Sequence, residues 1–220
     1  MVERMPDYRS IVVPRHGRVG LVGDPATATE AWLILHGYGM LAQGMLHWFE
    51  AAERPGRLLV APEGLSRFYQ ERHGVRTVGA SWMTREDRDH ELEDQQGYLD
   101  RVVADVIGPV PRLEVHGFSQ GVAAASRWVV RGLRPVARLV CWGGTVPPEM
   151  DPAALSRALG GAPVEMVVGE RDKWVAPEAV EADARRLSEG GCPTRLHRFD
   201  GGHRVDNGVL AHLQETAGTN

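Results

Sequence analysis

The chain has 220 residues, a length typical of one ordinary domain, and 43% of them are hydrophobic while 25% are charged. This composition excludes a disordered, collagen-like or coiled-coil protein. Its 25 basic residues against 29 acidic residues give a net charge of -4, which leaves no basic surface to neutralise phosphates and argues against nucleic-acid binding.

Short, continuous apolar runs alternate with longer segments of helical period along the chain, and this pattern predicts a mostly parallel sheet with helices on both faces. The chain begins with a predicted edge hairpin in residues 10–23, with its turn at residues 15–18. The strands that follow are predicted at residues 31–35, 57–61, 113–117, 137–142, 164–169 and 194–199. The predicted helices are residues 40–52, 90–106, 120–131, 177–188 and 207–215. The fold class is therefore α/β, in one domain over residues 1–220.

Residues 63–88 do not fit this alternation, because they are polar, aromatic and too long for a plain connection. Within them, Phe68, Tyr69, Trp82 and Met83 are candidates for an apolar substrate wall near the strand ends. The alternative, equally supported, is that they cover an edge of the sheet.

The sequence contains neither an apolar stretch in residues 1–10 nor a later apolar run long enough to span a membrane. We therefore expect a cytoplasmic protein with no export signal. Cys141 and Cys192 have neither a zinc-site spacing nor a disulfide pattern. The oligomeric state stays open.

A G-x-S-x-G motif, Gly117-Phe118-Ser119-Gln120-Gly121, lies between a predicted strand and a predicted helix. A serine at such a turn projects from the carboxyl edge of the sheet, where open α/β sheets bind ligands. The pattern predicts that Ser119 is a nucleophile.

A serine nucleophile needs a base and an acid that orients the base, and in this arrangement both follow the serine in the chain. Of the histidines after Ser119, His197 lies inside the last strand and His212 on the last helix, whereas His203 follows a flexible Asp-Gly-Gly loop. We therefore predict His203 as the base. The order excludes the earlier histidines: His16, His36, His47, His73, His90 and His116.

The acid is expected at the end of the preceding strand, and Asp172 is the prediction there. Glu170 is the competitor, better explained as a surface charge paired with Arg171 or Lys173. Asp200 is too near His203 in the sequence for its carboxylate to reach the imidazole easily, and a variant at Asp200 serves as a control for the choice of acid.

An oxyanion formed during acyl transfer also needs hydrogen-bond donors. The backbone N–H groups of Gln120 and of Tyr38, in the His36-Gly37-Tyr38-Gly39 loop, are the predicted pair. A dinucleotide-binding interpretation of Gly37 and Gly39 is weaker, since no acidic residue ends a strand about 20 residues further on.

A metal site formed by His197, Asp200 and His203 is a further alternative. Their spacing, on a strand that runs into a glycine loop, does not place the three side chains on one face. We therefore expect no metal and no cofactor.

With these residues in place, the chain resembles the phospholipase/carboxylesterase group of α/β-hydrolases, which includes the acyl-protein thioesterases. The shared segments are Leu35-His36-Gly37-Tyr38-Gly39, Ala61-Pro62, Gly117-Phe118-Ser119-Gln120-Gly121, Gly169 to Pro177 and Gly201-Gly202-His203. The resemblance implies an α/β-hydrolase fold with no large cap domain, and it carries over the triad of Ser119, Asp172 and His203 together with the Tyr38 and Gln120 donors.

The resemblance also implies a serine hydrolase that cleaves small-molecule carboxylic esters, with thioesters as a further substrate class, through an acyl-enzyme intermediate. Met40 follows the glycine loop where the thioesterases usually have an aspartate, so the reaction type transfers better than the substrate. A catalytically silent binding or regulatory protein on the same scaffold, and an acyltransferase, are the alternatives.

Overall fold

A seven-stranded sheet, six helices and a separate hairpin make up the part of the chain that the computed structural model describes, residues 7–72 and 74–216. The strands are β1 (Val19–Val22), β2 (Glu30–Leu35), β3 (Arg57–Pro62), β4 (Ser66–Arg72), β5 (Val75–Ser81), β6 (Arg112–Phe118), β7 (Arg138–Trp142), β8 (Val164–Gly169) and β9 (Thr194–Phe199). The helices are α1 (Ala42–Trp48), α2 (Arg88–Val102), α3 (Gln120–Val130), α4 (Pro152–Leu159), α5 (Pro177–Glu189) and α6 (Asn207–Thr216).

The strand order in the main sheet is β1-β3-β2-β6-β7-β8-β9, and every pairing is parallel except that of β1 with β3. From β2 the chain goes to β3 on one side and later reaches β6 on the other. The carboxyl ends of β2 and β6 therefore border a topological switch point, where open α/β sheets form ligand sites.

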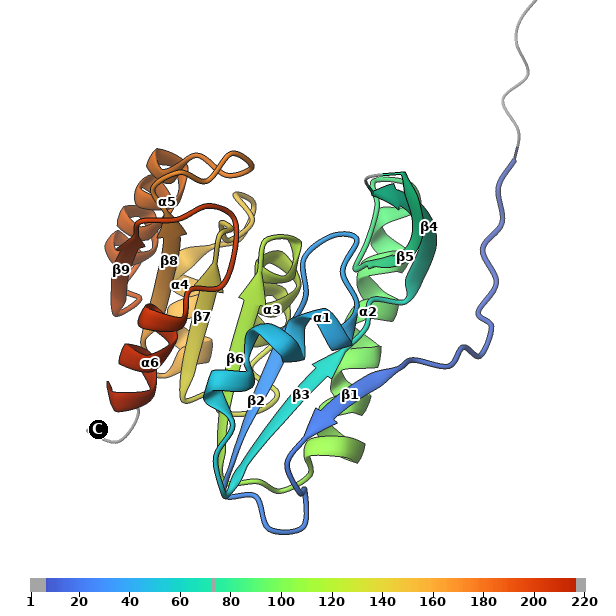
Figure 1. The fold of residues 1–220 in the computed structure, drawn as a ribbon. Helices are drawn as coiled ribbons and strands as arrows, with labels where there is room; N and C mark the ends of the chain where they lie inside the picture. Colours follow the sequence, from blue (N-terminus) through green and yellow to red (C-terminus); the bar gives the residue numbers. More distant parts are fainter. Residues whose placement is uncertain (1–6, 73, 217–220) are drawn as a thin grey trace, which may run out of the picture.

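Helices cover both faces of this sheet, which explains why its central strands are continuously apolar (Figure 1). One core packs α2, α3, α4 and α5 onto the sheet through residues such as Leu99, Trp128, Leu155 and Leu187. The other packs α1 and α6 against the opposite face around Trp32 and Trp142. The predicted doubly covered parallel sheet is confirmed.

The predicted hairpin at residues 10–23 is wrong in part. Only β1 forms, and it pairs with β3, while residues 10–18 run outside the sheet in an extended, exposed course. The helix predicted from residue 40 begins at Ala42, because the Met40 backbone carbonyl instead accepts a hydrogen bond from Ala80 N–H at 3.1 Å.

Two structured regions were absent from the sequence-based prediction. Residues 63–88 contain the β4–β5 hairpin, and α4 begins at an Asp151-Pro152 pair. Asp151 caps α4 by accepting a hydrogen bond from Ala153 N–H at 2.9 Å, a start signal that the sequence did contain.

Charged side chains of both signs run across the sheet near the amino ends of its strands. In order from β3 to β8, they are Arg57, Glu30, Glu114, Arg138 and Glu165, and all are buried. Arg57 pairs with Glu30, and Arg138 Nη2 lies 2.7 Å from Glu114 Oε2. Burial alone would raise the pKa of Glu114, but hydrogen bonding and charge from His116 and Arg138 lower it to about 2.

We predict that Glu114→Ala lowers the free energy of unfolding by about 3 to 5 kcal/mol, because it leaves the Arg138 guanidinium buried without its partner. The exposed Glu189→Ala is the control and should change stability by less than about 0.5 kcal/mol. Urea unfolding measures both. Equal effects of the two substitutions would contradict a structural role for the charged row.

Candidate active site

Ser119 occupies a sharp turn between β6 and α3, at the carboxyl edge of the sheet. Its backbone has φ 52 and ψ -116, a left-handed conformation that a residue with a side chain rarely adopts. The Ser119 N–H donates to the Trp142 carbonyl at 2.8 Å, which ties the turn to β7. Such strain persists only where surrounding contacts fix it, and it is concentrated at functional sites.

The glycines on either side of Ser119 allow the start of α3 to touch the end of β2. A Cβ atom on Gly121 would lie 2.2 Å from the Leu35 carbonyl oxygen, and one on Gly117 would lie 2.5 Å from the Gly121 carbonyl oxygen. Any side chain at either position would push α3 away from the sheet. The motif is thus a packing requirement as well as a chemical one.

His203 and Asp172 form a hydrogen-bonded pair from the loops after β9 and β8. His203 Nδ1 lies 2.7 Å from Asp172 Oδ2, and the Asp172 side chain is 1% exposed. The other carboxylate oxygen, Oδ1, accepts from Trp174 N–H at 2.8 Å and Val175 N–H at 3.1 Å. Since a carboxylate only accepts, His203 Nδ1 carries the proton and Nε2 is left as a base.

The His203 ring lies beside the serine turn. It packs on Phe118, the residue before Ser119, with ring centroids 4.7 Å apart. Gly143 passes next to it, because a Cβ there would lie 3.1 Å from His203 Nδ1. Within the described residues, no hydrogen bond joins the Ser119 hydroxyl to His203. Catalytic hydrogen bonds are often long before substrate binds.

The loop after β2 lies against the same turn. A Cβ atom on Gly37 would come within 2.8 Å of the Phe118 ring and 3.3 Å of Ser119 Cβ. In the described part of the chain, the backbone N–H groups of Tyr38 and Gln120 have no acceptor. Neither N–H group is therefore committed to another hydrogen bond within these residues.

Side chains from the β4–β5 region hold these two segments together. Gln120 Nε2 donates to Ser81 Oγ and to the Met83 carbonyl, each at 3.0 Å, and Gln120 Oε1 accepts from Trp82 N–H at 3.1 Å. Trp82 Nε1 donates to the His36 carbonyl at 2.7 Å. One short segment, Ser81 to Met83, therefore braces both the serine turn and the glycine loop.

Two glutamines that were not predicted from the sequence complete the brace. Gln70 Nε2 donates to the Gly39 carbonyl at 2.6 Å, and Gln95 Nε2 donates to the Trp82 carbonyl at 3.0 Å. Nothing in their local sequence indicates these distant partners. Gln95 is buried on α2, although its neighbours in the sequence are polar.

The four candidate wall residues do not form one surface. Phe68 stacks on Tyr38 with ring centroids 5.0 Å apart, and Trp82 is buried beneath the glycine loop, 4.8 Å from the His36 ring. Tyr69 is exposed under the Arg76 guanidinium, since consecutive strand residues point to opposite faces. Met83 is half-buried and accepts two hydrogen bonds through its carbonyl.

An aromatic residue that was not predicted from the sequence lies next to the Asp172–His203 pair. Trp174 is 82% exposed, and its ring centroid lies 6.5 Å from that of His203. Its position is fixed by its own N–H bond to Asp172. An exposed tryptophan beside a polar pair is a common feature of binding surfaces.

The alternative residues have other partners. His197 Nε2 lies 2.7 Å from Glu165 Oε2, and Asp200 pairs with Arg171. The three side chains of the alternative metal site thus interact with three different groups. Glu170 is exposed. His73, one of the excluded histidines, lies outside the described residues.

No protein-family model and no curated protein sequence matches this chain. Solved structures do. Esterase PE8 superposes with a TM-score of 0.69 at 22% identity, over 89% of this chain and 97% of that one. Acyl-protein thioesterase 2 from Zea mays superposes with a TM-score of 0.66 at 18% identity, over 92% of this chain and 100% of that one. A phospholipase/carboxylesterase from Dyadobacter fermentans superposes with a TM-score of 0.66 at 17% identity, over 94% of this chain and 98% of that one. The predicted α/β-hydrolase fold is confirmed.

The buried ring of His36 is held as one neutral tautomer. Gly64 N–H donates to Nε2 at 2.9 Å, and Nδ1 lies 2.8 Å from the Gly37 carbonyl, so Nδ1 carries the proton. Burial lowers the pKa of His36, and this outweighs the Gly37 carbonyl and Glu63, which raise it. A second proton, on Nε2, would point at the Gly64 N–H that now donates to this nitrogen.

The free energy of unfolding should fall as the pH decreases below about 6.5, because the unfolded chain binds a proton at His36 that the folded chain resists. In His36→Gln the slope should be smaller by up to about 1.4 kcal/mol per pH unit. Urea unfolding at a series of pH values measures it. The slope of the variant still contains the contribution of His116, because burial lowers the pKa of that histidine as well. Identical slopes in the two proteins would contradict this account.

Gly121→Ala should lower the free energy of unfolding by about 2 to 3 kcal/mol, because its Cβ has no space against the Leu35 carbonyl. Gly97→Ala is the matched control. A Cβ at Gly97, on α2, meets nothing within 4 Å, so alanine there should stabilise the protein by about 0.5 to 1 kcal/mol. Thermal or urea unfolding distinguishes the two signs.

Proposed function

We propose that this protein is a serine hydrolase that cleaves carboxylic esters through an acyl-enzyme intermediate, with thioesters as a further substrate class. The observation that carries the proposal is the hydrogen bond of His203 to the buried Asp172 carboxylate, beside a strained serine at the switch point of the sheet. The similar solved structures named as esterases, a thioesterase and a phospholipase/carboxylesterase support this reaction class.

In the proposed reaction, Ser119 Oγ forms a bond to the acyl carbon as His203 Nε2 takes the hydroxyl proton. The carbonyl π electrons move to the oxygen, and the tetrahedral intermediate then expels the alcohol, or the thiol, which receives the proton from His203. Water repeats the sequence and releases the acid. Asp172 holds the ring and stabilises the imidazolium ion, since its carboxylate stays paired throughout.

The oxyanion is proposed to bind the free N–H groups of Tyr38 and Gln120. Donors of this kind stabilise the transition state only when they are already in position, and each contributes about 3 to 4 kcal/mol. The support for this role is the brace described above. It connects the segments that carry both donors to Ser81 and Trp82, so neither needs to reorganise as charge develops.

Labelling with a fluorophosphonate tests the nucleophile directly. We expect stoichiometric modification at Ser119 and none in Ser119→Ala. The substitution should reduce kcat by a factor on the order of 10⁶, as is typical of a nucleophile in a triad. Folded wild-type protein that neither reacts with the probe nor hydrolyses p-nitrophenyl esters would instead be the silent binding protein.

Asp172→Asn should reduce kcat about 10⁴-fold, because the amide favours the wrong imidazole tautomer. Asp200→Asn is the matched control, being three residues from His203 but paired with Arg171. It should leave kcat within about threefold, as expected of an exposed ion pair. Equal losses in the two variants would show that the acid has been assigned wrongly.

The apolar side of the substrate is proposed to lie between Trp174 and the stacked Tyr38–Phe68 pair, which flank the triad. Trp174→Ala should lower kcat/KM more for long acyl esters than for short ones. The difference in activation free energy should be about 0.5 to 1.5 kcal/mol, as for a lost aromatic contact. Leu133→Ala removes another exposed hydrophobic residue, beyond the far end of α3, and is the control. Parallel chain-length profiles would exclude Trp174 from the substrate site.

A further inference from the structure

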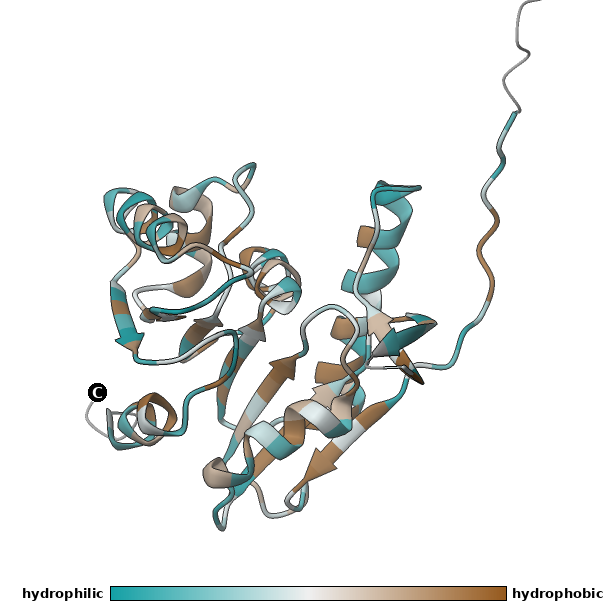
Figure 2. Ribbon diagram, turned by 45° about the horizontal axis from the view of Figure 1, so that its top comes forward, coloured by the Kyte–Doolittle hydropathy of each residue, from teal (hydrophilic) through white to brown (hydrophobic). Residues whose placement is uncertain are grey.

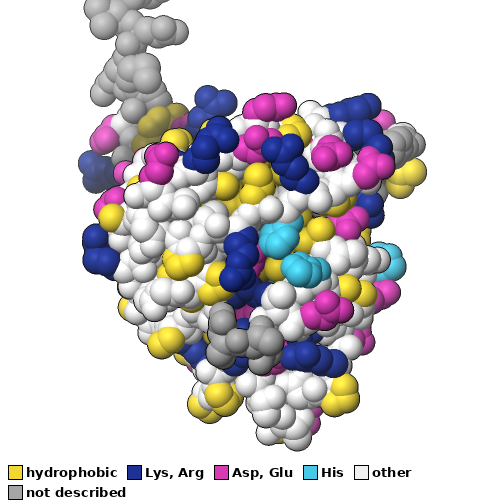
Figure 3. Space-filling view, turned by 90° about the vertical axis from the view of Figure 1, so that its left-hand side faces the viewer, with side chains coloured by type: hydrophobic (Ala, Val, Ile, Leu, Met, Phe, Trp, Pro, Cys, Tyr) yellow, Lys and Arg dark blue, Asp and Glu magenta, His cyan; other side chains and the backbone are white. Residues whose placement is uncertain are grey.

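The two edges of the main sheet differ in chemistry. On β9, Arg195, His197 and Arg198 are paired with acidic side chains from β8 and α5. Figure 3 shows acidic, basic and histidine side chains intermingled on this side of the molecule. Charged edges of this kind prevent a further strand from adding. The opposite edge strand, β1, has the sequence Val-Gly-Leu-Val and carries no charge of its own.

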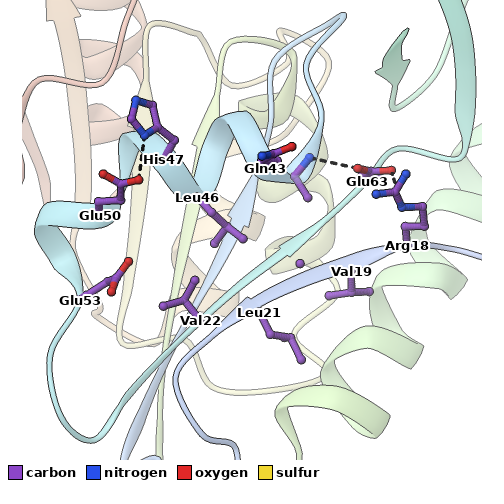
Figure 4. Close-up of a pocket in the computed structure, with 12 residues that line it drawn as sticks. Arg18, Val19, Leu21, Val22, Gln43, Leu46, His47, Glu50, Glu53 and Glu63 are labelled. Carbon is purple, nitrogen blue, oxygen red and sulfur yellow. Dashed lines mark hydrogen bonds and ion pairs between the residues drawn. The ribbon is translucent and has the colours of Figure 1, made fainter.

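A groove of about 420 Å³ lies between β1 and α1, away from the triad (Figure 4). Its apolar middle is formed by Val22 and Leu46. Glu50 and Glu53 lie at one end of the groove, where Glu50 forms a hydrogen bond with His47. In the described residues β1 has only β3 as a neighbour, so its outer edge offers backbone donors and acceptors to another strand.

The segment before β1 has the complementary properties. Ile11, Val12 and Val13 are β-branched residues with 82%, 99% and 63% of their surface exposed, and they form an apolar run in the extended arm (Figure 2). We call residues 8–16 the arm. Arg9 and Arg15 flank the apolar run with positive charge. Such a run favours a β-strand, and leaving it in water is costly.

Contacts at the base of the arm direct it away from the β1 edge of its own molecule. Tyr98 packs on Gly17, where a Cβ would lie 2.2 Å from the ring, and its hydroxyl donates to the Arg18 carbonyl at 2.8 Å. Further along, Ser10 Oγ lies 3.4 Å from Asp87 Oδ2 near the start of α2. In Figure 1 the arm accordingly leaves the body of the molecule instead of folding back beside β1.

We propose that two copies of this chain associate by exchanging arms, with the arm of each copy added as a strand to the β1 edge of the other. Ile11 and Val13, which share one face of an extended strand, pack into the groove beside Val22 and Leu46. One of the two flanking arginines of the arm then lies toward Glu50 and Glu53, at one end of the groove. The exchange is mutual and closes as a dimer with twofold symmetry. It does not depend on the proposed enzymatic function.

Sedimentation equilibrium of the full chain tests the association. We expect a concentration-dependent dimer in the wild type and a monomer in Ile11→Asp/Val13→Asp, while ester hydrolysis and far-UV circular dichroism stay unchanged. Leu133→Asp adds one aspartate at an exposed position beyond α3 and should leave the dimer intact. A wild type that is monomeric up to millimolar concentration, or a dimer that persists in the double variant, would overturn the proposal.

Cross-linking tests which edge is used. Cys141 and Cys192 are buried, and burial raises the pKa of both thiols, so introduced cysteines react first. A mixture of Val12→Cys and Leu21→Cys chains should give a covalent dimer with a short bismaleimide, whereas Val12→Cys mixed with Leu133→Cys should not. The absence of that dimer would overturn the proposal. So would a cross-linked monomer from Val12→Cys/Leu21→Cys at high dilution, because the arm would then fold onto its own edge.

Discussion

The close approach of the start of α3 to the end of β2 is the constraint on which the candidate site depends. With no side chain at Gly121, the helix can begin against the Leu35 carbonyl. This contact fixes the left-handed turn at Ser119 and brings the glycine loop after β2 alongside it. The serine turn and the glycine loop then lie together beside the switch point, which the parallel sheet order creates.

The β4–β5 excursion has a structural role that its position outside the sheet does not suggest. The glycine loop accepts hydrogen bonds from Gln70 on β4 and from Trp82 just after β5. Gln120 connects the serine turn to Trp82 by another hydrogen bond. A loop with unpaired donors would otherwise be free to turn them toward water. Preorganisation of this kind is what makes backbone donors effective in stabilising a developing charge.

The polar groups at the two ends of the sheet strands differ in burial. At the amino ends of the strands, charges such as Glu114 and Arg138 are buried in matched pairs, which costs desolvation but permits few alternative arrangements of the strands. At the carboxyl ends, polar groups are left partly accessible, as at His203 and Ser119. A rigid base thus supports loops that carry the candidate chemistry.

The sequence by itself determined the parallel sheet, most of its helices and the residues of the Ser119 motif, because apolar period and glycine spacing are local properties. Only the tertiary structure decided the partners of those residues. It paired His203 with Asp172, assigned His197 to Glu165, and drew Gln95 and Trp82 under the glycine loop. It also separated residues 10–18 from β1, because contacts with Tyr98 outweighed a local preference for a hairpin. Such contacts join segments distant in the chain, and the local pattern of residues carries no record of which segments will meet.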